Sequence, residues 1–506
     1  MINADDLPQL PKGWFWTTLG DVRLDNGRAI VPAKTPDQLF ELYSVPRFEE
    51  REPEIVSGKE VGSSKQIVEK ETVLLCKINP RINRVWIVGD FSPHPKIAST
   101  EWIPFFRQEG IEPEYLCYFM RNDSFKTYLA SNASGVGGSL MRIRPATFLA
   151  YPFPLAPKNE QCRIVGRVEE LFSYLDAGVE SLLKVKTLLK HYRQAVLKYA
   201  FEGKLTEEWR KTHKDQIDTI KNPLGKTERE SKVRRDVPEK VEIPEDLQQT
   251  SMPQSWSFFS VADLLRNGAF IDVKDGNHGT NHPKAGDFTS DGLPFITASQ
   301  VIDFEIDYEN APKLKGRPLE KLKVGFSHPG DVVLSHKGTV GRVGICKQEC
   351  VLSPQTTYYR TSADLIDRSF LAYFFASPLF QSQLAAVKSQ TTRDFVSISK
   401  QYALFVVVPS ILEQKEIVAE IDNRLPITRH IERIIDENLL GSQRLRRSIL
   451  GSAFEGALVP QDPSDEPAEN LLERIKAERA KSKGEKDTNK RRKNKPNQLE
   501  LSSYVK

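Results

Sequence analysis

The sequence lacks long apolar runs and is poor in cysteine. No stretch approaches about 18 uninterrupted apolar residues, which argues against a membrane-spanning helix. The opening MINADDLPQL has no apolar segment of the kind found in secretory signals. Only five of 506 residues are cysteine, and they are scattered, which argues against a secreted disulfide framework and predicts a reducing, cytoplasmic location. With 39% hydrophobic residues, the chain can still form cores in about three domains.

Motifs of common catalytic and metal sites are also missing. Gly225-Lys226-Thr227 resembles the end of a phosphate-binding loop, but the position that requires glycine is Ile220. Two short-spaced pairs of possible metal ligands have no further ligands nearby: His278 with His282, and Cys346 with Cys350. We therefore expect no catalytic residue, no metal site and no cofactor bound by this chain.

The positive charge is concentrated at the C-terminal end. Residues 474–506 contain twelve Lys or Arg against four Asp or Glu, a net charge of +8, while the whole chain carries +4. The remaining residues therefore carry about −4. The overall charge says little about the folded part, so any nucleic-acid site must be argued from local groups of residues.

The chain contains an internal repeat with a long period. LPKGWFWTTLGDV recurs as MPQSWSFFSVADL after 242 residues, whereas NEQCRIVGRV recurs as LEQKEIVAEI and YAFEGKL as SAFEGAL after 253 residues. These segments begin at positions 10 and 252, 159 and 412, and 199 and 452. The equal offset of the last two pairs means that the stretch between them has the same length in both copies.

That stretch has a 3.5-residue apolar repeat, which is typical of a coiled-coil helix. Gly203 stands where a C-terminal helix cap is expected, and Pro426 should kink or split the second copy. Each helix could instead pack only on its own domain. The expected packing residues are Ile164, Val168, Leu171, Leu175, Leu182 and Leu189 in the first copy, and Ile417, Ile421, Ile431, Ile435, Leu445 and Ile449 in the second.

The segments before each helix have a mixed α+β pattern. Strands are expected at 72–78, 84–88, 331–335 and 342–345, and aromatic helices at 115–119 and 370–374. The domain prediction is a first variable domain (1–157), a first long helix (158–205), a solvated linker (206–250), a second variable domain (251–409), a second long helix (410–460) and a basic, disordered tail (461–506).

Four polar loops stand at matching places in the two variable domains. Their donors suit base edges and phosphates, and their glycines permit close backbone approach. Ordinary surface hairpins are the alternative for any one of them. The DNA-binding candidates are Lys77, Asn79, Arg81, Asn83, Arg84, Ser134, Ser139, Arg142 and Arg144 in the first domain, and His336, Lys337, Thr339, Arg342, Thr391, Thr392 and Arg393 in the second.

With these features in order, the chain resembles the specificity subunits of type I restriction–modification systems. The resemblance extends from about residue 10 to 475 and rests on the LPKGWFWTTLGDV opening, the Glu-Gln-x-x-Ile-Val helix entries and the two Ala-Phe-Glu-Gly boxes. KINPRINRV (77–85) and GLPFITASQV (292–301) also look like segments of this family's target-recognition domains.

The resemblance implies a non-catalytic subunit in which each variable domain reads one half of an asymmetric, bipartite DNA sequence. The two long helices would pack as an antiparallel coiled coil and fix the spacer between the halves. The implied partners are double-stranded DNA, two modification subunits with S-adenosylmethionine that methylate adenine, and two restriction subunits that use ATP and Mg²⁺.

Two other classes of function are compatible with parts of the pattern. One is a single-chain restriction–methylation enzyme, which the missing motifs disfavour. The other is a coiled-coil adaptor without a role in DNA binding. The DNA target and the spacer length do not follow from the sequence, because recognition depends on loop geometry and DNA shape.

Overall fold

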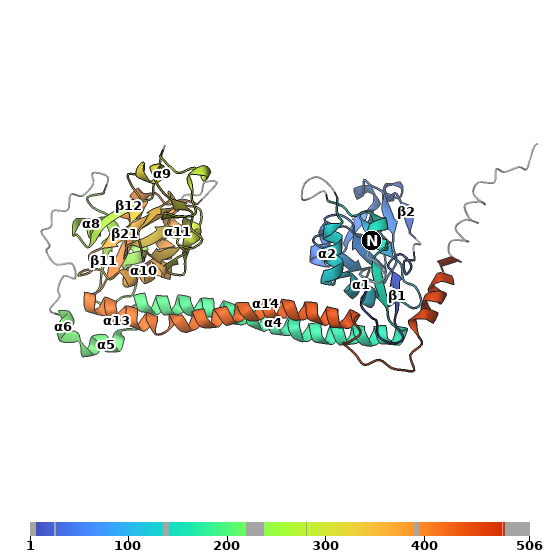
Figure 1. Cartoon of the computed structure of the whole chain (residues 1–506). Coiled ribbons are helices and arrows are strands. Elements are labelled where there is room, and N and C mark those ends of the chain that lie inside the picture. The colour runs from blue at the N-terminus through green and yellow to red at the C-terminus, as the bar shows by residue number, and fades with distance from the viewer. Residues whose placement is uncertain are drawn as a thin grey trace, which may run out of the picture. The chain divides into compact units, whose positions relative to one another are not determined.

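A computed structural model of the chain describes residues 7–24, 27–134, 141–218, 237–279, 281–388, 394–477 and 479–480. The chain divides into two compact units, drawn in Figure 1. The first unit consists of Met1–Leu182 and Glu437–Lys506, and the second of Leu183–Asp436. Each unit therefore combines one domain with parts of both long helices.

The first domain contains three groups of strands. Strands β1 and β10 form an antiparallel pair, β2-β5-β8-β3-β4 form a five-stranded sheet, and β7-β6-β9 form a three-stranded sheet. The strands are β1 (Phe15–Thr18), β2 (Arg28–Ile30), β3 (Leu39–Tyr43), β4 (Glu54–Ser57), β5 (Lys65–Ile67), β6 (Val73–Cys76), β7 (Val85–Ile87), β8 (Lys96–Ser99), β9 (Trp102–Phe105) and β10 (Pro152–Leu155).

Three short helices complete the first domain: α1 (Pro113–Met120), α2 (Asp123–Ser131) and α3 (Pro145–Leu149). Pro at the first position of α1 and α3 suits a helix start. Phe119, Phe125 and Phe153 are buried in a core that also contains the start of the first long helix. The domain is thereby fixed to that helix by apolar packing. Three 3-10 turns lie at Pro32–Lys34, Pro46–Glu50 and Gly58–Glu60.

The second domain has four groups of strands: the pair β11-β22, the sheets β12-β21-β18-β19 and β16-β13-β20-β17, and the hairpin β14-β15. The strands are β11 (Ser257–Ser260), β12 (Phe270–Asp275), β13 (Leu293–Ile296), β14 (Val301–Ile302), β15 (Glu305–Ile306), β16 (Lys313–Leu314), β17 (Phe326–Ser327), β18 (Val332–Ser335), β19 (Val343–Ile345), β20 (Cys350–Leu352), β21 (Thr356–Thr361) and β22 (Phe405–Val408).

The second domain contains helices that correspond to those of the first domain, and two further helices, α8 and α9. They are α8 (Val261–Arg266), α9 (Arg317–Glu320), α10 (Arg368–Ala376), α11 (Pro378–Val387) and α12 (Ile398–Tyr402), with 3-10 turns at Ala285–Asp287 and Ala298–Gln300. Helices α10, α11 and α12 correspond in order to α1, α2 and α3, and the pair β11-β22 corresponds to β1-β10. This shared order is consistent with the internal repeat.

The expected strands and aromatic helices are present. Strands β6, β7, β18 and β19 lie within the four predicted ranges, and α1 and α10 contain the two aromatic segments. All four residues of β6 and all four of β18 are buried. Both faces of these strands are therefore covered, whereas a strand with one face in solvent would alternate between buried and exposed residues.

The first long helix, α4 (Lys158–Phe201), is continuous over 44 residues. The second copy forms two helices, α13 (Ile411–Asp422) and α14 (Leu425–Phe454). The break near Pro426 is therefore confirmed, and the proline stands at the second position of α14, where its missing N–H costs no hydrogen bond. The predicted cap is also present, because Gly203 has a φ of 75° just after α4.

The two long helices pack antiparallel within each unit. In the second unit, Lys186 Nζ lies 2.5 Å from Asp436 Oδ1, and Arg193 Nη1 lies 3.0 Å from Glu432 Oε2. The residue numbers of the contacting pairs thus increase along α4 and decrease along α14, as expected for antiparallel helices. In the first unit, Asp176 of α4 pairs with Arg446 of α14.

The predicted packing residues are not buried equally. Ile164, Val168, Ile417, Ile421, Ile435 and Ile449 are buried, whereas Leu171, Leu175, Leu182, Leu189 and Ile431 are half-buried. The prediction for Leu445 was wrong, because its side chain is 50% exposed. A pair of helices covers only a narrow stripe of each partner, and complete burial occurs where a domain adds a third surface.

The linker and the tail contain more structure than expected. Helices α5 (Glu207–Thr212), α6 (Lys214–Asp218) and α7 (Glu245–Gln248) lie within residues 206–250. The prediction that the whole of 461–506 is a disordered tail was wrong for its first part. Residues 468–477 are helical, and Ala468, Leu471, Leu472 and Ile475 are buried in the core of the first unit. The basic residues beyond 480 lie outside the described part of the chain.

Over the described ranges, no single helix has the length and apolar character needed to cross a membrane. Helices α10 and α11 reach that length only as a pair bent by 62°, and Phe370, Phe374 and Phe380 from this pair are buried in the core of the second unit.

Candidate nucleic-acid interface

In the first domain, the structure brings the two predicted polar loops together. Asn79 N donates to Met141 O at 2.8 Å, and Ile143 N donates to Lys77 O at 3.0 Å. Ile78 and Arg142 form an isolated antiparallel bridge. The loop after β6 and the segment before α3 therefore form one continuous surface, although more than 60 residues separate them.

The second domain repeats this arrangement with a different sequence. Gly338 N donates to Asp394 O at 3.0 Å, and Val396 N donates to His336 O at 2.9 Å. Lys337 and Phe395 form the corresponding bridge. The two pairs of loops thus have equivalent backbone hydrogen bonds in the two domains.

Left-handed backbone occurs at the same two places in each loop. Asn79 and Asn83 have φ values of 51° and 54°, and Gly338 and Gly341 have φ values of 79° and 94°. Asparagine and glycine are the residues that adopt this region most readily. The loop shape is therefore encoded by different residues in the two copies.

Seven of the sequence candidates present exposed side chains at these paired loops. They supply guanidinium, ammonium and hydroxyl donors, which can bond to guanine edges or to phosphate oxygens. The exposed candidates are Arg81, Ser134, Arg142 and Arg144 in the first domain and Lys337, Thr339 and Arg342 in the second. Arg142 pairs with Glu101 at 3.1 Å, and Arg342 Nη1 donates to Ala298 O at 3.2 Å. A ligand phosphate would have to compete with the carboxylate of Glu101.

His336 contradicts the prediction that it contacts DNA, because its side chain is fully buried. It lies beside Phe395, and its Nε2 is 3.8 Å from Asp275 Oδ1. Burial lowers the pKa of His336, although Asp275 opposes the shift. The imidazole is part of the packing under the loop and is not available to a DNA duplex.

When the loops of the two domains are compared, His336 occupies the position of Lys77. Both residues accept a hydrogen bond from the adjoining loop through their carbonyl oxygens. Lys77 and Lys337, which both belong to the polar loops, therefore stand one position apart when the two domains are compared. The ammonium group of Lys77 donates to Thr100 O at 2.7 Å.

Arg84 and Arg342 do match, since Cys76 N donates to Arg84 O and Ser335 N donates to Arg342 O. However, the Arg84 side chain is only 15% exposed, and its Nε lies 3.5 Å from Glu49 Oε1. Asn83 points inward and donates to Met120 O at 2.8 Å. These two residues offer less to a ligand than their sequence positions suggested. Ser139, Thr391, Thr392 and Arg393 lie outside the described residues.

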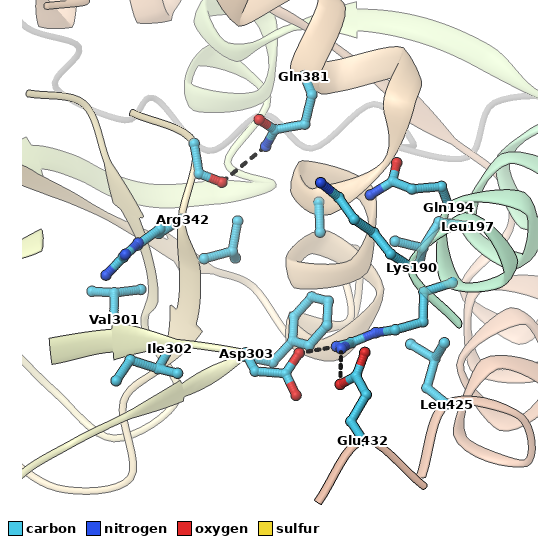
Figure 2. A pocket seen from close by; sticks show the side chains of 15 residues that line it. Lys190, Gln194, Leu197, Val301, Ile302, Asp303, Arg342, Gln381, Leu425 and Glu432 are labelled. Carbon is cyan, nitrogen blue, oxygen red and sulfur yellow. Dashed lines mark hydrogen bonds and ion pairs between the residues drawn. The ribbon is translucent and has the colours of Figure 1, made fainter. Parts of the chain in front are cut away.

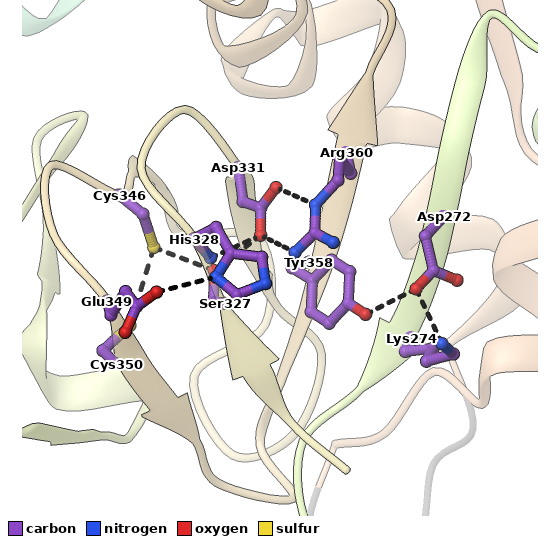
Figure 3. A network of polar contacts seen from close by, with 10 residues as sticks. All are labelled: Asp272, Lys274, Ser327, His328, Asp331, Cys346, Glu349, Cys350, Tyr358 and Arg360. Carbon is purple, nitrogen blue, oxygen red and sulfur yellow. Dashed lines mark hydrogen bonds and ion pairs between the residues drawn. The ribbon is translucent and has the colours of Figure 1, made fainter. Parts of the chain in front are cut away.

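At the other end of β18 from its polar loop, the second domain contains a buried polar network (Figure 3). Arg360 Nε and Nη2 donate to the two oxygens of Asp331 at 2.8 and 2.7 Å. Ser327 also donates to Asp331 and lies 3.0 Å from Cys346 Sγ. The adjacent Cys350 Sγ holds the pKa of Cys346 below its usual value through a hydrogen bond. This network supports the sheet and lies away from the paired loops.

Sequence reasoning did not assign a role to the repeated Glu-Gln pair. Gln161 Nε2 donates to Ala156 O and Gly110 O, and its Oε1 accepts from Glu112 N, which precedes α1. Gln414 makes the same three bonds, to Pro409 O, Leu365 O and Asp367 N before α10. The repeated glutamine therefore fixes each long helix to the start of its domain's aromatic helix. Its recurrence in both copies was the signal for this role.

Two hollows lie where the helices meet the domains, one within each unit. The hollow in the first unit has a volume of about 760 Å³ and is lined by α1, α2, α4 and α14. The hollow in the second unit has a volume of about 550 Å³, and its lining includes Lys190, Arg342 and the β14-β15 turn (Figure 2). In the described residues, no cluster of three or more His, Cys, Asp or Glu side chains could hold a metal ion.

The fold defines a class of proteins with two α+β domains, repeated along one chain and joined through a pair of long antiparallel helices. One similar solved structure is described as the structural basis of complex assembly and conformational transition of the type I R-M system. A chain of that structure aligns over its whole length with 89% of the present chain, at a TM-score of 0.67 and 19% identity. The HsdS subunit of Thermoanaerobacter tengcongensis covers 89% of this chain at a TM-score of 0.50 and 19% identity, over 98% of its own length.

Curated proteins similar to this chain are specificity subunits of type I restriction enzymes. The EcoBI specificity subunit of Escherichia coli is 27% identical over 372 residues, which are 72% of each chain. The EcoKI specificity subunit of E. coli strain K12 is 25% identical over 401 residues, or 74% of each chain. No family model matches the chain. The chain is thus similar over most of its length to the specificity subunits of type I restriction–modification systems.

Proposed function

We propose that this chain is the DNA-recognition subunit of a type I restriction–modification complex and has no catalytic activity of its own. Each domain reads one half of an asymmetric, bipartite site through its paired polar loops, and the antiparallel helices set the spacer. The observation that carries this proposal is the recurrence of the same loop pairing, with exposed donors, at one place in both domains.

The helix pair supports the proposed division of labour. Helix α4 runs without interruption over 44 residues, and an α-helix of that length extends about 66 Å. Its ends are held by buried apolar contacts within each unit, including Val168 in the first and Phe201 in the second. A long element fixed in this way suits a protein that reads two half-sites at a defined spacing.

The partners proposed for this chain are double-stranded DNA, two modification subunits and two restriction subunits, which act together in the cytoplasm. The chemistry belongs to those partners: S-adenosylmethionine on the modification subunits for adenine methylation, and ATP with Mg²⁺ on the restriction subunits. The chain itself binds none of these cofactors in this proposal.

The test is to combine the full chain with its modification subunit and S-adenosylmethionine, and to map methylated adenines on a library of random duplexes. Two fixed half-sites separated by a constant spacer are expected, and the chain alone should methylate nothing. Methylation by the isolated chain would favour a single-chain enzyme. Assembly without sequence preference would favour an adaptor.

A pair of lysine variants provides the local control. Lys337→Ala should weaken binding of all duplexes about equally and lower the salt dependence by about one unit, as expected for a phosphate contact. Lys315→Ala removes another exposed lysine, which follows β16 and pairs with Asp291. It should leave binding unchanged. Equal effects of the two variants would contradict a DNA face at the paired loops.

A further inference from the structure

The turn of the β14-β15 hairpin has an unusual backbone. Asp303 and Phe304 both lie in the left-handed region, with φ values of 46° and 69°. Two-residue hairpin turns of this kind normally contain Asn, Asp or Gly, so Asp303 is an ordinary residue for its position, whereas the aromatic Phe304 is unfavourable there. Such a conformation persists only where the surroundings hold it in place.

The contacts that hold this turn come from the two long helices and from the domain itself, where Phe304 exchanges backbone hydrogen bonds with Val343 and Ile345. The Asp303 carboxylate pairs with Arg193 of α4 and, at 2.8 Å, with Arg429 Nε of α14. Arg193 also pairs with Glu432 of α14 at 3.0 Å (Figure 2). The Phe304 ring lies 4.8 Å from the Tyr373 ring and 5.9 Å from the guanidinium carbon of Arg429.

The same domain is also attached to the helices through a shared apolar core. Phe201, near the end of α4, packs against Phe370 and Phe374 of α10, with ring centroids 5.4 and 5.1 Å apart. Arg193 is about two turns earlier on α4. Because a hollow of about 550 Å³ adjoins the hairpin turn, the polar contacts of Asp303 hold the domain there without continuous apolar packing.

The first unit has a different arrangement at the matching place. Arg446, which is 253 residues after Arg193, pairs with Asp176 of α4 and lies 4.5 Å from the Phe172 ring. Both of these partners belong to the helix pair and not to the domain. The nearby contact between Arg447 and Asp123 of α2 is 3.0 Å long, but both side chains are more than half exposed.

We propose that Asp303 is a positioning residue that sets the orientation of the second domain on the helix pair, and thereby restricts the spacer lengths that the protein accepts. The apolar core that the domain shares with Phe201, Ile421 and Leu425 attaches it to the helices. The contacts of Asp303 with both helices add a polar attachment outside that core and thereby fix the angle of the domain. Asp303 does this without contacting DNA. This inference rests on the proposed function, because spacer selection presupposes that the two domains read two half-sites.

The experiment measures methylation by the full chain with its modification subunit, on duplexes whose spacer is varied by one base pair in either direction. Asp303→Asn should lower the preference for the native spacer at least about tenfold, while the preference at each position of both half-sites stays unchanged. Asp303→Glu retains the charge and should recover part of the spacer preference. A structural defect alone would reduce all rates together.

Asp176→Asn is the matched control, since it removes the carboxylate that pairs with the corresponding arginine inside the helix pair. It should leave spacer preference unchanged. Arg429→Gln is a second variant that breaks the same contact from the helix side and keeps Asp303 in place. It should broaden the spacer preference as Asp303→Asn does, even if the latter fails to fold.

The inference is overturned if either Asp303→Asn or Arg429→Gln assembles and retains the native spacer preference. It is also overturned if the two half-site sequences change along with the spacer. If the unmodified protein directs methylation without any bipartite preference, the proposed function fails instead, so the two failures are distinguishable.

Discussion

Glu160 and Glu413 are fully buried at equivalent places near the starts of α4 and α13, yet their surroundings differ. Glu413 accepts from Trp256 Nε1 at 2.8 Å, from Thr206 at 2.9 Å and from Arg210 at 2.6 Å. Among the described residues, no hydrogen bond of good geometry reaches either oxygen of Glu160, although Trp14 and Gln461 lie near it. The repeat therefore preserved a buried carboxylate at both sites, but only the linker after α4 supplies a guanidinium to one of them.

The largest expected effect separates these two glutamates. Glu413→Gln should lower the free energy of unfolding of the second unit by about 3 kcal/mol, because it leaves the mostly buried Arg210 without a counter-charge. Glu160→Gln should be neutral or stabilising, since it removes a buried charge that has no direct cationic partner. Denaturant unfolding followed by tryptophan fluorescence measures both. Equal losses of unfolding free energy in the two variants would contradict the inference that the two glutamates have different surroundings.

The glycines of the two Ala-Phe-Glu-Gly boxes should behave alike. Gly203 and Gly456 have φ values of 75° and 72°, and a Cβ at either would collide with Pro253 or Pro11, respectively. Alanine at each position should lower the free energy of unfolding by about 2 kcal/mol. The control is Gly178→Ala, where nothing lies within 4 Å, which should stabilise α4 by about 0.5–1 kcal/mol. Thermal unfolding of the three variants provides the measurement.

Arg84 and Arg342 occupy matching positions after the polar loops, but their removal should affect DNA recognition to different extents. Arg342→Ala should cost about 1–3 kcal/mol if Arg342 reads a base, and should relax one position of the second half-site only. Arg84→Ala should affect only the first half-site and to a smaller extent, since that side chain is 15% exposed and faces Glu49. Methylation of libraries randomised in one half-site measures both. Changes in both half-sites from one variant would contradict separate readers.

The smallest expected effect is a pH dependence that belongs to Glu160. Burial raises the pKa of Glu160, against the opposing influence of Trp14, Gln461 and Arg163. A carboxyl with a raised pKa in the folded state contributes stability below its unfolded pKa and loses it as the pH rises through the folded pKa. The advantage of Glu160→Gln over the unmodified protein should therefore be present at neutral pH and disappear in acid. Unfolding curves of both proteins between pH 4 and 8 measure this difference in stability. A difference that does not change with pH would mean that packing, and not the charge of Glu160, causes it.

Local patterns determined much of the fold. The heptad spacing predicted α4, Pro426 predicted the break before α14, and Gly203 predicted the cap, because each depends on neighbours a few residues away. The paired polar loops were also visible as matching segments of a repeat. The sequence did not show which of their side chains would be buried. His336 and Leu445 were assigned to the wrong environment because burial depends on residues that are distant along the chain.

By itself, the sequence determined the duplication, the lengths of the long helices and the resemblance to specificity subunits of type I restriction–modification systems, since all of these follow from local pattern and repeat spacing. Only the tertiary structure decided that Leu471 and Ile475 join the first core, that Lys77 corresponds to His336, and that Asp303 contacts both helices. In each case the partners are separated by many residues. Their meeting depends on how whole elements pack, which no local periodicity records.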